Sequence, residues 1–448
     1  MNFTEQQIET LAPDSSSLKA GKGLSNANVW LIKQFNDRVL WGEIKGSGSK
    51  PYRTQIDLQN IAFKCSCPSF KFPCKHGIGL MLAFAKQPDG FSQTDVEPEW
   101  VKEWIEKRAT KAEKKEVEAK EISPETDEKN NKSKEKRQND RTIQVESGIA
   151  ELELWLKDLV RTGFLSLPSK DARFFEQVAA RMVDAKATGL AGRVRAFREL
   201  NYIQGNDWQS SALRISAELF LLIEGFKNAQ NLSVEWQYSI KNLVGWNQSQ
   251  KELLQNFEAE RIKDNWVVLG QEQKENEGVT VQRNWLWGTK TNRSALILNF
   301  GTPFSPLENS VLPGSVIEAE LAFFPSVLPH RAVLSMQKRF IESLEELPNL
   351  TENWDAAYEE RTSQLAKYPF VQDIPMILKE MRLVLLKNDY VLCDNTLHFH
   401  PISPSWTESK MLMFYAHAGN EPTALAGVFR RDGFLPLGIF DGNNYIIL

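Results

Sequence analysis

Hydrophobic residues follow different spacings in successive parts of this chain. Near the N-terminus, NVWLIKQF and DRVLWGEIKG are short runs rich in β-branched, aromatic and aliphatic residues, which predicts β-strands. From about Gly148 the apolar side chains recur every three or four positions, which predicts amphipathic helices. From about Trp266 the period changes to two, which predicts strands, apart from a helical pattern near residues 353–387. We therefore predict an α+β protein whose helices are followed by a mainly antiparallel sheet.

One stretch has almost no hydrophobic pattern. Residues 99–147 contain hardly any large apolar side chain after Ile105 and are dense in Lys, Glu, Asn and Ser. Such a segment buries too little apolar surface to fold alone, so we predict a solvated linker that is helical in part. A charged tract that contacts a partner is the alternative. The predicted regions are a small module at 1–98, the linker at 99–147, a helical region at 148–260 and a strand-rich mixed region at 261–448.

Composition narrows the class of protein. The 448 residues are 42% hydrophobic and 25% charged, as in an ordinary globular protein of two or three domains. The net charge of −4 creates no general attraction for nucleic acid or membranes, so such binding requires a local patch. The N-terminal stretch shows no signal-peptide pattern, and no window approaches the roughly 18 apolar residues of a membrane span. We expect a cytoplasmic protein without membrane contact.

Cysteine is sparse but clustered. Three of the four cysteines lie in KCSCPSFKFPCKHGIGL, at Cys65, Cys67 and Cys74, and His76 follows. In an extended strand Cys65 and Cys67 point to the same side, and Cys74 and His76 form a second pair at the start of a predicted helix. Three thiolates and an imidazole suit tetrahedral Zn²⁺ and argue against Mg²⁺ or Ca²⁺. Buried thiols or a disulfide are the alternatives, and a reducing compartment disfavours the disulfide.

The cluster predicts one structural zinc ion. Four protein ligands leave no open coordination position for a catalytic water, so the metal would stabilise the small module. The pattern CxCx6CxH on a strand–strand–helix unit resembles the SWIM zinc finger. The stretches LWGEIKGSGSKPYRTQIDL and ARMVDAKATGLAGRVR also resemble bacterial SWIM-domain proteins, so the resemblance extends over residues 1 to about 200.

The resemblance implies zinc ligands and partners. It makes Cys65, Cys67, Cys74 and His76 the ligands of Zn²⁺. The family is associated with DNA binding or protein–protein interaction, and its bacterial members often occur in gene neighbourhoods with MoxR-type AAA ATPases. These associations imply a nucleic-acid partner, a protein partner such as an AAA ATPase, or both.

Basic residues outnumber acidic ones around the cluster. Six lysines or arginines stand against Asp57 alone, and aromatic residues are interleaved with them. Such a mixture can bind phosphates and stack bases. The alternative is that the lysines offset the thiolate charge and the aromatics cover a small core around zinc. The candidate contact residues are Lys45, Lys50, Tyr52, Arg53, Lys64, Phe70, Lys71 and Lys75.

The sequence favours a binding protein over an enzyme. It contains no P-loop, G-x-S-x-G elbow or HExxH motif. We predict a non-enzymatic protein whose zinc module binds nucleic acid, protein or both. The alternatives are an adaptor that serves a MoxR-type AAA ATPase through its C-terminal region, and an enzyme with an unrecognised site in 148–448. A second metal site at Cys393, His398 and His400 is a weaker hypothesis, set against histidines that simply face solvent.

Overall fold

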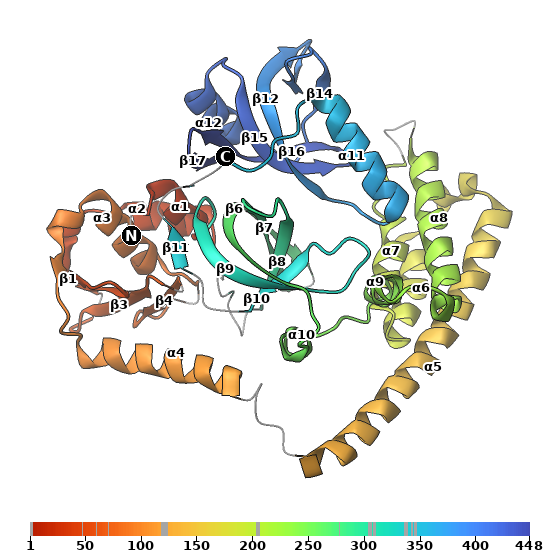
Figure 1. Ribbon diagram of the computed structural model, residues 1–448, viewed down its shortest axis with the longest axis horizontal. Helices are drawn as coiled ribbons and strands as arrows, with labels where there is room; N and C mark the ends of the chain where they lie inside the picture. Colours follow the sequence, from red (N-terminus) through yellow and green to blue (C-terminus); the bar gives the residue numbers. More distant parts are fainter. Residues whose placement is uncertain are drawn as a thin grey trace. The chain divides into compact units, whose positions relative to one another are not determined.

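The fold consists of two compact units, Met1–Lys114 with Glu260–Phe323 and His330–Leu448, and Lys115–Ala259 with Phe324–Pro329 (Figure 1). The computed structural model confirms the α+β prediction. No helix in the described part of the chain is long and apolar enough to cross a membrane. The structure describes all residues except 1–2, 47, 60, 70, 118–123, 203–206, 277, 303–306, 308–310, 336–338, 342–343 and 345–346, and it does not describe the side chains of 109–138 and 276.

The N-terminal module is a five-stranded sheet with helices on both faces (Figure 1). Strands β1 to β4 form antiparallel pairs in chain order, and β5 runs parallel to β1 at the edge. The strands predicted in NVWLIKQF and DRVLWGEIKG are confirmed as β1 and β2. The elements are α1 (Glu5–Thr10), α2 (Ser15–Lys22), β1 (Trp30–Phe35), β2 (Val39–Ile44), β3 (Tyr52–Asp57), β4 (Ala62–Cys65), α3 (Lys75–Lys86), β5 (Ser92–Gln93) and α4 (Glu99–Val117).

Alternation along the strands gives this sheet two apolar faces. Leu40 and Ile56 face the helices α1 to α3 in one buried cluster. Trp41 faces the other way and is buried against Trp104 and Ile105 of α4. The predicted linker 99–147 thus begins with a helix whose first turns pack on the sheet, because its few apolar side chains lie at helical spacing.

The second unit is mainly helical. The break between α6 and α7 lies at Ala185–Ala187, where Lys186 adopts a φ of +61°. Gly189 and Gly192 lie inside α7. The elements of this unit are α5 (Pro124–Thr162), α6 (Ala172–Asp184), α7 (Thr188–Ala196), α8 (Trp208–Lys227), α9 (Val234–Val244) and α10 (Gln250–Gln255).

A small closed barrel follows within the first unit. Strand β10 pairs with β8 on one side and β9 on the other, so β6, β7, β8, β10 and β9 form a ring without free edges. Its interior contains Trp266, Leu286 and Phe323. The strands are β6 (Arg261–Asn276), β7 (Val279–Gly288), β8 (Ser294–Gly301), β9 (Val316–Phe323), β10 (Arg331–Leu334) and β11 (Arg339–Ile341).

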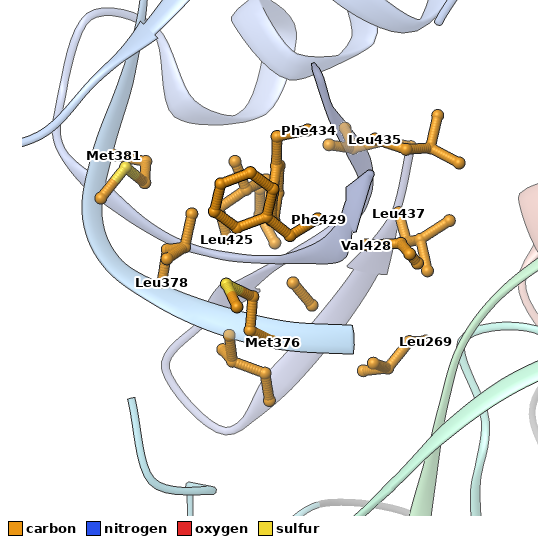
Figure 2. Close-up of a cluster of buried hydrophobic side chains, with 14 of the residues drawn as sticks. Leu269, Met376, Leu378, Met381, Leu425, Val428, Phe429, Phe434, Leu435 and Leu437 are labelled. Atoms are coloured by element: carbon orange, nitrogen blue, oxygen red, sulfur yellow. The ribbon is translucent and has the colours of Figure 1, made fainter. Parts of the chain in front are cut away.

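The chain ends in an antiparallel sheet of six strands, ordered β14-β13-β12-β15-β16-β17. Figure 2 shows part of a buried hydrophobic cluster that contains side chains of this sheet, such as Met376, Phe429 and Leu437, together with Leu269 of β6. Trp354 of α11 and Phe414 of α12 are buried in the same cluster, so both helices pack on this core. The elements are α11 (Trp354–Lys367), β12 (Ile374–Leu386), β13 (Asp389–Cys393), β14 (Phe399–Pro401), α12 (Glu408–Ala418), β15 (Thr423–Arg430), β16 (Gly433–Asp441) and β17 (Asn444–Ile447).

Candidate metal centre

The end of a strand and the start of a helix bring the four predicted ligands together. Cys65 is the last residue of β4, Cys74 is the N-cap of α3, and His76 is the second residue of that helix. Their ligand atoms, with that of Cys67, all lie within 4.8 Å of one another. The Nδ1 atom of His76 is 3.7 Å from the Cys65 sulfur and 3.9 Å from the Cys74 sulfur. A tetrahedral zinc site with usual bond lengths has S···N edges of about 3.6 Å, so the donor atoms fit a zinc ion.

The thiols favour a metal electrostatically. A hydrogen bond between Cys65 and Cys74 raises the pKa of the Cys65 thiol and lowers that of Cys74 to about 3. Burial raises the pKa of Cys67. The thiols of Cys65 and Cys67 thus hold their protons more tightly than a free cysteine does, and a bound zinc ion would supply the positive charge that lets all three cysteines ionise.

Neighbouring side chains fix the orientation of the ligands. The Thr54 hydroxyl lies 3.3 Å from the Cys65 sulfur, and the Tyr52 ring packs on the His76 ring with centroids 5.1 Å apart. At Gly77 an added Cβ would lie 2.8 Å from the Phe63 ring, so a glycine is needed for α3 to approach β4 this closely. The helix start and the strand end are thereby held at the distance that the ligand set requires.

Four of the predicted contact residues gather beside the zinc ligands. Tyr52, Lys45, Lys71 and Lys75 line a cavity of about 480 Å³. Residues of the zinc site, Cys67 and His76, line the same cavity, as do Ser16, Ser17 and Ala20 of α2. The contribution of α2 to this cavity could not be predicted from the sequence, because the helix is about 50 residues away along the chain and carries no motif.

The other predicted contact residues lie elsewhere. Arg53 faces α4, and its guanidinium lies over the Trp100 ring of that helix. Its Nε is 3.0 Å from Oε1 of Glu43 on the neighbouring strand β2. Lys64 pairs across the sheet with Gln55 and shares that face. Lys50 is exposed in the turn between β2 and β3, and Phe70 lies outside the described residues. Contact by any of these residues stays a prediction.

The site defines a class, a zinc finger module whose Cys₃His group is closed by protein ligands. Residues 52–85 match the family model of the SWIM zinc finger, and residues 140–244 match that of the SWIM-associated four-helix bundle domain. The chain therefore contains a SWIM zinc finger, with a group positioned to bind one zinc ion, followed by a SWIM-associated helical bundle. No curated protein and no solved structure matches the chain.

The hypothesis of a second metal site is wrong. His398 precedes β14, so strand alternation does not align its ring with that of His400. It is half-exposed and lies 3.4 Å from Asp355 Oδ1. His400 is buried, with its Nδ1 2.7 Å from the Tyr358 hydroxyl and its ring against Trp354. Within the described ranges, the Cys₃His cluster is the one group of three or more side chains that could hold a metal.

Burial of His400 predicts a loss of stability in acid. Burial, followed by the charge of Arg361, lowers the pKa of His400 from 6.5 to about 4. Below about pH 6.5 the His400 imidazole binds a proton in the unfolded chain but not in the folded chain. The stability that neutral His400 contributes is therefore fully present above pH 6.5 and is lost as the pH falls towards 4. Between pH 7 and 5 we expect the free energy of unfolding to fall by about 2 kcal/mol from this residue. Urea unfolding at both pH values should show that loss reduced in His400→Phe, and an equal loss in both proteins would contradict the prediction.

Proposed function

We propose that this protein is a non-enzymatic, zinc-organised binder of nucleic acid. The observation that carries the proposal is the gathering of Lys45, Lys71 and Lys75 around a cavity beside the zinc ligands, in a chain whose net charge is −4. No Asp or Glu is among the described residues that line this cavity. Phosphate contacts from lysines supply most of the affinity in sequence-independent nucleic-acid binding.

Charge compensation alone does not account for these lysines. Lys71 is engaged by Asp14, with its Nζ 2.9 Å from Oδ2. A zinc ion with three thiolates carries one negative charge, which a single lysine balances. Lys45 and Lys75 are exposed and form no ion pair with any described residue, so the surface keeps an excess of positive charge.

The zinc ion has a structural role in this proposal. Its four protein ligands leave no position for a reacting water, so the metal holds the loop and the start of α3 in place. The lysines on that loop and helix are thereby presented in a fixed arrangement, which reduces the entropy cost of ordering them on binding.

A salt titration tests the proposal. Zinc-loaded full-length protein is titrated against a fluorescein-labelled 20-mer of thymidine and a 20-base-pair duplex. With one phosphate contact from each of Lys45 and Lys75, the logarithm of the association constant should fall against the logarithm of salt concentration with a slope of about −1.4 for the single strand and about −1.8 for the duplex. Absence of binding to both probes at 25 mM salt would contradict the proposal.

A protein partner is the second candidate, and one observation favours it. Leu213, Phe220 and Leu221 are exposed at helical spacing on α8 and form an apolar stripe. Such a stripe is a common feature of protein contact surfaces. If the titration shows no nucleic-acid binding, an adaptor role towards a MoxR-type AAA ATPase becomes the proposal, with this stripe as the contact.

A further inference from the structure

The cavity beside the zinc ligands has walls from three separate parts of the N-terminal module. Ser16 and Ser17 come from the first turns of α2, and Lys45 and Tyr52 flank the turn between β2 and β3. The remaining wall is formed by the start of α3 and by the loop that connects β4 to α3, residues 66–74, which we call the zinc loop. A volume of about 480 Å³ lies within the range of sites that enclose a small ligand, about 300–1,000 Å³.

The cations of the cavity differ in how far they are already engaged. Lys71 Nζ contacts the carboxylate of Asp14 and donates to the Ser16 hydroxyl at 2.9 Å, so it is fixed in position. Asp14 also accepts from Ser17 N at 2.7 Å and caps α2. Lys45 and Lys75 have no such partner in the described part of the chain and remain available for an anion.

An aromatic ring lies in the same cavity as these ammonium groups. The Tyr52 ring is half-buried and lines the cavity, its centroid is 5.1 Å from that of the tilted His76 ring, and an added Cβ at Gly46 would lie 2.9 Å from it, so these contacts limit its motion. A fixed aromatic ring beside cations is the combination that binds single strands, since every base has a face that can stack. Bases inside a duplex are already stacked and do not offer that face.

Resting on the proposed function, we propose that this cavity is a binding site for one nucleotide of single-stranded nucleic acid. Lys45 and Lys75 each bind one of the two backbone phosphates that flank the nucleotide, and its base stacks on Tyr52. Lys71 is a positioning residue, because it ties the zinc loop to α2 through Asp14 and so holds the cavity open.

A pair of double variants tests the assignment in the full-length, zinc-loaded protein. Lys45→Ala/Lys75→Ala removes the two cavity lysines that form no ion pair with a described residue, and Lys19→Ala/Lys102→Ala removes the same charge from exposed positions outside the cavity. The probes are the labelled 20-mer of thymidine and the 20-base-pair duplex. We expect the cavity variant to lose at least about 10-fold in affinity for the single strand at 50 mM salt and its salt slope to shrink by about 1.4, which corresponds to two lost contacts. The control variant should stay within about 3-fold of wild type.

The outcomes separate this assignment from the proposed function. Equal losses in the two double variants would overturn the assignment and leave a diffuse electrostatic contact. Tighter binding of the duplex than of the single strand would overturn the single-strand assignment while the proposed function stands. Absence of binding by the wild-type protein would overturn both. The zinc content of each variant, measured by mass spectrometry, should equal that of wild type, because none of the substituted lysines is a ligand.

Discussion

Cys74→Ser is expected to abolish stoichiometric zinc binding and to release the zinc loop from the sheet. The serine hydroxyl does not ionise near neutral pH, so the site would lose a thiolate at the point where α3 begins. A ligand present at 1,000 times its dissociation constant stabilises a fold by about 4 kcal/mol, and that contribution would disappear. Metal analysis by mass spectrometry should show the loss of zinc, and limited proteolysis should show new cleavage between residues 64 and 75.

Cys393 provides the matched control. It is also buried, and its thiol donates to the carbonyl of Asp394 at 3.4 Å, but it lies in the C-terminal sheet away from the cluster. Cys393→Ser should keep one zinc ion per chain and an unchanged cleavage pattern in the zinc loop. A full zinc content in purified Cys74→Ser would show that the ligand set is wrong.

Substitution of one glycine in the helical unit, Gly189, should strongly destabilise the fold. In Gly189→Ala the new Cβ would lie 2.1 Å from the carbonyl oxygen of Leu243 and 2.9 Å from the carbonyl carbon of Val244. Both atoms are backbone, so α7 and α9 must move apart. Arg193 would also lose its bridge between the two helices, where it donates to the carbonyls of Gly189 and Leu243. We expect a destabilisation of about 3 kcal/mol, measured by urea unfolding followed at 222 nm.

A second glycine of the same helix, Gly192, allows the effect of close packing to be distinguished from the effect of helix propensity. Gly192 has no atom within 4 Å of an added Cβ and lies in the interior of α7. Gly192→Ala should therefore stabilise the protein by about 0.5–1 kcal/mol, because alanine is the better helix former. Similar unfolding midpoints for the two variants would contradict the close approach of α7 and α9.

Short-range features were predictable from the sequence. The zinc ligands are two pairs, each within three residues, so strand alternation and the start of a helix are enough to bring each pair together. The first two strands followed from their own composition, since both are short runs rich in β-branched, aromatic and aliphatic residues. The family resemblance, which rested on the ligand spacing and the flanking segments, agrees with the matches over residues 52–85 and 140–244.

Features that depend on distant segments were not predictable. Gly189 lies inside α7 and permits the close contact with Leu243, which is more than 50 residues away along the chain. The pairing of β10 with both β8 and β9 closes a barrel that no local pattern indicates. Similarly, Arg53 and Lys64 looked equivalent to Lys75 in the sequence, yet strand alternation puts them on the face that α4 covers.

The central claim is that zinc organises a basic surface that binds nucleic acid. The most direct measurement compares the affinity of the labelled 20-mer of thymidine for zinc-loaded full-length protein with its affinity for protein depleted of zinc by a chelator, at 50 mM salt. We expect at least about 10-fold weaker binding without zinc, restored when zinc is returned, because the lysines of the loop and of α3 lose their fixed arrangement. Equal affinity with and without zinc would contradict the claim.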